Sequence, residues 1–145
     1  MSTKGPERVN EMVGLLREWQ GIERKAMEQT AEIIEKTDNA YLRLIMEIIR
    51  HDSLMHHRVQ GFIIDTMTTG NVALSHDELA AIWDSIQAHD ETEKNVIKIA
   101  EELREKAWTP LHKHLLEYLL TDEKKHDHLL EQLEQVKRDM SRSTQ

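Results

Sequence analysis

The chain repeats itself at an offset of seventy residues, and this repeat restricts the fold more than any other feature of the sequence. At this offset His56 matches His126, and Glu23 matches Glu93. Further matches are Glu32 with Glu102, Glu35 with Glu105, Lys36 with Lys106, Glu47 with Glu117, Ile33 with Leu103, Ile49 with Leu119 and Val59 with Leu129. Because the matches include most of the acids and histidines that could bind a metal, the repeat indicates two copies of one helical hairpin.

Apolar residues recur with a period of 3.5 to 3.6 residues in four stretches, which is typical of amphipathic helices. Helix-start signals separate the stretches: short polar residues ending at Asn39, a capping box of Ser75 and Glu78, and Thr109 followed by Pro110. The pattern predicts helices over about 6–36, 39–68, 76–106 and 110–140.

Four such helices with short connections predict an all-α fold, namely an antiparallel four-helix bundle built from two duplicated hairpins. We expect a single domain over residues 1–145, with repeat halves at about 6–70 and 76–140. Glu23 and His56 lie at similar distances from the first hairpin turn, and Glu93 and His126 from the last. The four side chains are therefore expected at one level of the bundle.

Composition narrows the class of protein and of ligand. The chain has no cysteine, so a bound metal must be held by nitrogen and oxygen atoms. A formal net charge of −8 argues against nucleic-acid binding through phosphate neutralisation. No apolar run reaches the length of a membrane span, and the first residues lack an apolar signal core, so we expect a cytoplasmic protein without membrane contact.

Acids and histidines interrupt the apolar faces of all four predicted helices. Glu23 and Glu93 fall inside the apolar stripes of the first and third, and an unpaired carboxylate is costly to bury there. A divalent cation would neutralise such a cluster. Its expected ligands are Glu23, His56, Glu93, Glu123 and His126, with Asp52 and Asp122 as hydrogen-bond partners of the imidazoles. Carboxylate and imidazole ligands suit iron or manganese, with zinc as a further option.

A helix-borne Glu followed in the next helix by Asp-Glu-x-x-His resembles the ferritin-like superfamily, nearest the rubrerythrin type. The motif is complete at Glu93, Glu123 and His126, and recurs at Glu23 and His56. The resemblance covers the whole predicted bundle and implies iron ions that react with oxygen or peroxide, held by these five residues. It implies a non-haem iron oxidase or peroxide-scavenging protein. The cysteine segment of rubrerythrins is absent, so electrons would come from a separate donor.

The first copy departs from the family pattern because Ser53 stands where Glu123 stands in the second. The fourth helical carboxylate is therefore missing. The predicted site is then asymmetric, singly occupied, or loaded with zinc or manganese. Asp52 or His89 would be a substitute ligand, since Asp52 adjoins Ser53 and His89 precedes Glu93 by one turn.

Two alternatives remain open at the level of sequence. Residues 69–75 span only about 25 Å when extended, which is short for a ferritin-like crossover, so an up-down-up-down bundle of hemerythrin-like type is the second architecture. The second function class is a non-catalytic helical interaction or structural protein whose polar core is a relic. Whether the chain is an enzyme is left open, and a homodimer is compatible with either architecture.

Overall fold

The described part of the chain contains helices and no strands. The computed structural model describes residues 4–70 and 75–143. These residues form four helices, α1 (Lys4–Lys36), α2 (Ala40–Thr68), α3 (His76–Lys106) and α4 (Pro110–Ser143). The prediction of an all-α chain is confirmed, and each observed helix end lies within three residues of the expected one. Within the described ranges, no helix is both long enough and apolar enough to cross a membrane.

Polar side chains fix the starts of three helices. Asn39 Oδ1 accepts the backbone N–H three residues along the chain at 3.0 Å. Ser75 and Glu78 form a reciprocal capping box, in which each side chain accepts the backbone N–H of the other residue. Thr109 Oγ1 accepts an N–H of the first turn of α4 at 3.2 Å, and Pro110 at the first position has no N–H to satisfy. These caps pair N–H groups that a helix start otherwise leaves without partners.

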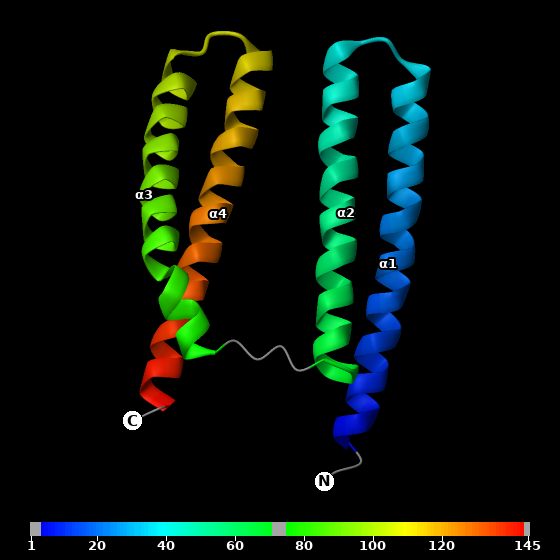
Figure 1. Ribbon diagram of the computed structural model, residues 1–145. Helices are drawn as coiled ribbons and strands as arrows, with labels where there is room; N and C mark the ends of the chain where they lie inside the picture. The colour runs from blue at the N-terminus through cyan, green and yellow to red at the C-terminus, as the bar shows by residue number, and fades with distance from the viewer. Residues whose placement is uncertain (1–3, 71–74, 144–145) are drawn as a thin grey trace. The chain divides into compact units, whose positions relative to one another are not determined.

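The chain divides between α2 and α3 into two compact units. In the first unit α1 packs along α2, and in the second α3 packs along α4. Each pair runs antiparallel and is joined by a short turn (Figure 1). Both units are therefore helical hairpins, and their expected union into one four-helix domain stays a prediction.

The residues that face the partner helix occupy a heptad pattern, with alternating steps of three and four. In α1 the buried or half-buried residues at these heptad positions are Val9, Val13, Leu16, Gln20, Glu23, Met27, Thr30 and Ile34. The same positions seventy residues later face α4 in α3, namely Leu79, Trp83, Ile86, Asp90, Glu93, Ile97, Ala100 and Arg104. In the other two helices, Met46, Ser53, His57, Gln60, Ile64 and Met67 correspond to Leu116, Glu123, Asp127, Leu130, Glu134 and Lys137. The repeat in the sequence is thus also a repeat in packing.

Neither hairpin buries its apolar stripe completely. Among the described residues, the buried apolar side chains are Ile64, Leu79, Ala100 and Leu120. Large apolar side chains from all four helices stay exposed on their own hairpin, including Met12, Trp19, Val59, Phe62, Ile82, Leu103, Leu119 and Leu129. Each hairpin therefore has an apolar face in addition to its helix–helix interface.

Candidate metal centre between α3 and α4

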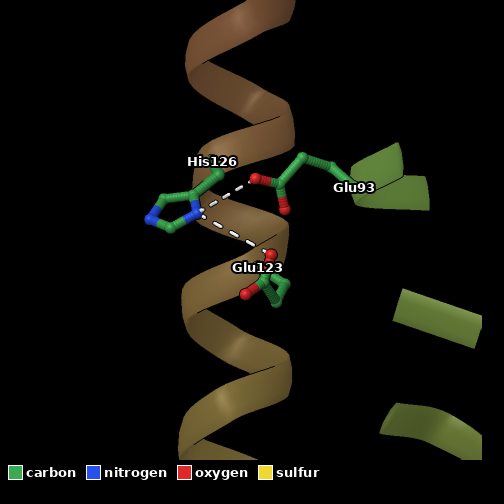
Figure 2. A group of neighbouring side chains, drawn as sticks. All are labelled: Glu93, Glu123 and His126. Atoms are coloured by element: carbon green, nitrogen blue, oxygen red, sulfur yellow. Dashed lines mark ion pairs between the residues drawn. The ribbon is translucent and has the colours of Figure 1, made fainter. Parts of the chain in front are cut away.

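Two glutamates and a histidine converge on one point of the α3–α4 interface. Glu93 reaches across from α3, while Glu123 and His126 lie on the facing side of α4 (Figure 2). Residues three apart on a helix share a face, so the spacing of Glu123 and His126 brings both side chains to Glu93. One carboxylate oxygen from each glutamate and a ring nitrogen of His126 all lie within 4.8 Å of one another.

The distances between these groups leave room for an ion. His126 Nδ1 lies 3.7 Å from Glu93 Oε1 and 3.8 Å from Glu123 Oε2. Both separations are too long for hydrogen bonds. Metal–ligand bonds of about 2.1 Å place neighbouring ligand atoms roughly 3 to 3.5 Å apart, so small movements would suffice to bind a cation.

Glu93 is the most deeply placed member of the cluster. The residue is only 8% exposed, and its Oε2 is buried with no hydrogen-bond partner among the described residues. Its other oxygen, Oε1, lies 2.9 Å from Nε2 of His89, one turn earlier on α3. A buried carboxylate oxygen without a donor requires a proton, a water molecule or a cation.

The two glutamates have opposite pKa shifts. The hydrogen bond with Glu93 raises the pKa of Glu123, and burial and the charge of Glu93 raise it further. The same hydrogen bond lowers the pKa of Glu93, and His126 and His89 assist, although burial acts in the other direction. Glu123 therefore loses its proton at a higher pH than Glu93 does. A divalent cation between the two carboxyl groups would favour the ionised form of both.

The far nitrogen of His126 also faces a carboxylate. Asp122 Oδ2 lies 3.5 Å from His126 Nε2. When Nε2 carries the proton and faces Asp122, Nδ1 is left with its lone pair directed toward the two glutamates. This tautomer is the one that binds a metal through Nδ1.

A second carboxyl pair, Asp90 with Asp127, lies one turn further along the same interface. Lys94 Nζ lies 2.9 Å from Asp90 Oδ2 and lowers the pKa of Asp90. The hydrogen bond to Asp90 raises the pKa of Asp127, and burial acts in the same direction. The sequence patterns described above did not predict this pair. The heptad spacing could have found it, because Asp90 precedes Glu93 by three positions and Asp127 follows Glu123 by four.

The first hairpin contains a reduced version of the centre. His56 Nδ1 lies 3.5 Å from Glu23 Oε2, and Glu23 is 8% exposed. Ser53 is buried at the position that Glu123 occupies in the second hairpin, and Asp52 is half-buried beside it. The side chain of His56 is 59% exposed on this hairpin.

Of the five expected ligands, the structure brings Glu93, Glu123 and His126 together, and it pairs Glu23 with His56 in the other unit. Of the expected supporting residues, His89 contacts Glu93 and Asp122 faces His126. That all five ligands share one site stays a prediction.

Comparisons of the chain with protein-family models, with curated proteins and with solved structures give no match.

Proposed function

We propose that the α3–α4 hairpin binds a divalent metal ion through Glu93, Glu123 and His126. One observation carries the proposal: the buried Glu93 has an oxygen without a donor, and it lies beside a second carboxyl group and an imidazole nitrogen, with one ligand atom of each residue within 4.8 Å of the others. The donor atoms are oxygen and nitrogen, the set that hard and borderline divalent cations prefer. Among the described residues, this is the group of three with the required convergence.

Iron is the metal we propose first, with manganese or zinc as alternatives. Two carboxylates and one imidazole suit all three metals, and the resemblance to ferritin-like proteins favours iron. Bound iron would supply one-electron exchange with oxygen or peroxide. The chain's own contribution would be to hold Glu93 through His89 and to fix the ring of His126 through Asp122.

We further propose that the apolar faces of the two hairpins cover each other in a four-helix bundle of ferritin-like type. Two helices with so few buried apolar side chains gain little free energy to offset the ordering of the backbone. The exposed apolar residues include positions matched at the repeat, such as Val59 with Leu129 and Ile49 with Leu119. If the two faces packed against each other, the exposed apolar residues of both hairpins would be buried.

The second candidate function is a non-catalytic helical interaction protein that binds no metal. The observation in its favour is that a shared proton can satisfy each of the two carboxyl pairs, and Lys94 balances one of them. On this reading Glu93 and Asp90 lie in a polar interface whose only role is structural.

Metal titration of the full chain separates the two candidates. Protein purified without an affinity tag and stripped with a chelator is titrated with Mn²⁺ and Zn²⁺ in a calorimeter, and with Fe²⁺ in the absence of oxygen. We expect saturable binding, weakened by about 10-fold to 100-fold or more in Glu93→Gln and in His126→Ala.

The chain offers a matched control for these variants on the same helix. His128 Nδ1 lies 3.8 Å from Glu131 at the same three-residue spacing, but both side chains are about two-thirds exposed. His128→Ala should leave the affinity unchanged. Absence of saturable binding would favour the non-catalytic interaction protein instead. Equal binding by wild type and Glu93→Gln would mean that the metal binds elsewhere and would refute the proposed site.

A redox role adds a separate expectation. The chain loaded with Fe²⁺ should consume hydrogen peroxide faster than an equal concentration of Fe²⁺ with Glu93→Gln, as followed by the loss of peroxide over time. Equal rates would leave a metal-binding protein without this activity.

A further inference from the structure

The two hairpins present the same interface positions with different numbers of carboxylates. Seventy residues separate the members of five equivalent pairs around the centre: Gln20 with Asp90, Glu23 with Glu93, Asp52 with Asp122, Ser53 with Glu123 and His57 with Asp127. All five members are acidic in the second hairpin and two are acidic in the first. The interface geometry is therefore shared, while the negative charge that attracts a cation is concentrated between α3 and α4.

At the equivalent level of the first hairpin, neutral and cationic side chains form the hydrogen bonds between the two helices. Gln20 Nε2 donates to the backbone carbonyl of His57 at 3.1 Å, and Arg24 Nη1 lies 3.1 Å from His57 Nε2. In the second hairpin Asp90 and Asp127 replace Gln20 and His57, and Lys94 replaces Arg24. Both hairpins therefore carry a cation at this level, but only the second adds two carboxyl groups, which attract a divalent cation where neutral side chains do not.

In the first hairpin Glu23 faces one imidazole, that of His56. His56 Nδ1 lies 3.5 Å from its Oε2, and that oxygen is buried without a hydrogen bond in the described structure. Ser53 faces the same interface, with the residue only 6% exposed, but its hydroxyl is neutral and short. The first hairpin thus offers one carboxylate and one imidazole where the second offers two carboxylates and one imidazole.

Building on the metal site proposed above, we propose that the chain binds one metal ion per molecule, between α3 and α4, and that Ser53 is the residue that prevents a second ion from binding between α1 and α2. Two protein ligands leave most of a metal's coordination sphere to water, and such binding is weak. A carboxylate at position 53 would stand to Glu23 and His56 as Glu123 stands to Glu93 and His126, because Ser53 and Glu123 are equivalent positions of the helix–helix interface, the first buried and the second half-buried.

The test counts ions in the full chain with Mn²⁺ as the probe. Bound Mn²⁺ is measured by calorimetric stoichiometry and by elemental analysis after equilibrium dialysis. The free Mn²⁺ concentration is set about tenfold above the dissociation constant that the titration of wild type gives, so that a site of this affinity is filled. Wild type should bind one ion, Ser53→Glu two, and the size-matched neutral variant Ser53→Gln one. The double variant Ser53→Glu with Glu93→Gln should bind one.

Circular dichroism checks that Ser53→Glu folds. Two further variants test the inference even if it does not. Glu23→Gln should keep one ion per chain, and Glu93→Gln should lose it. Two ions on wild type, or one ion on folded Ser53→Glu, would overturn the inference and leave the α3–α4 site standing. No ion on wild type would instead refute the proposed function, and the inference with it.

Discussion

Two carboxyl pairs lie one helical turn apart between α3 and α4. The hydrogen bond to its partner raises the pKa of Glu123 in one pair and of Asp127 in the other. The partners Glu93 and Asp90 have lowered pKa values. Each pair therefore behaves as a single proton-binding unit.

At the scale of single residues, Asp127→Asn should stabilise the chain at neutral pH. The raised pKa of Asp127 means that the folded chain binds a proton more tightly than the unfolded chain does. Stability is lost as pH rises from the ordinary aspartate range through the raised pKa. The side-chain amide of the introduced Asn donates a hydrogen bond to Asp90 at any pH, because its N–H does not titrate. The midpoint of thermal unfolding should therefore rise by about 2–4 °C at pH 7.

The gain from Asp127→Asn should vanish at acid pH, where Asp127 is protonated and donates as the amide does. The groups that face Asp127 are Asp90 and Lys94 on α3 and Glu131 on α4, so their titration is included in both curves. Asp84→Asn removes the same charge from an exposed site on α3 and serves as the control. A gain in stability that is equal at all pH values, or equal in the control, would contradict a pH-dependent hydrogen bond between Asp127 and Asp90.

At the scale of helices, the sequence predicted more of the fold than of the interfaces. Apolar periodicity and caps located the four helices, because both depend on local spacing and on short-range hydrogen bonds. The apolar stripes did not reveal that Ser53, Gln60 and Asp127 face the partner helix. In a two-helix contact the interface lies at the edge of the stripe, where polar residues are common, and the stripe's centre faces elsewhere.

Only the part of the candidate site that lies within one helix or repeats between the halves could be predicted from the sequence. Glu123 and His126 are three residues apart, so one helix face holds both, and the repeat indicated Glu93. The contact of Asp90 with Asp127 depends on the relative rotation of α3 and α4, which neither helix's own sequence specifies. His89 lies four positions before Glu93, and the structure shows that its side chain contacts Glu93 while it stays 60% exposed.

The capping box makes a prediction at the same scale. Ser75→Ala removes the side-chain oxygen that accepts the N–H of Glu78, and should lower the free energy of unfolding by about 1 kcal/mol. Chemical denaturation followed by circular dichroism measures the change. Ser85→Ala, at an exposed position inside α3, is the matched control and should be neutral or slightly stabilising. Equal destabilisation by both would argue against a capping role.

At the scale of the whole molecule, the four-helix bundle is proposed because each hairpin exposes an apolar face. Val59 is 52% exposed on its hairpin and Leu54 is 45% exposed, but only Val59 matches an apolar residue at the repeat, Leu129, whereas Leu54 matches Lys124. The two residues are on the same helix and are equally accessible within that hairpin. Their substitution therefore distinguishes a covered face from a free one.

Val59→Glu should lower the free energy of unfolding by at least about 2 kcal/mol, because a bundle would bury the introduced charge. Leu54→Glu should change it by less than about 1 kcal/mol, the usual range of a surface substitution. Urea unfolding of both full-length variants measures the difference. Equal small effects would mean that the face of α2 at Val59 remains in solvent.

The turn that joins α1 to α2 and the turn that joins α3 to α4 are each three residues long, and they too are seventy residues apart. No insertion or deletion thus separates the halves from Val9 to Met67 and from Leu79 to Lys137. If the halves descend from one ancestral hairpin, they diverged there by point substitution alone. The difference between a half that holds an ion and a half that does not would then amount to a few codons.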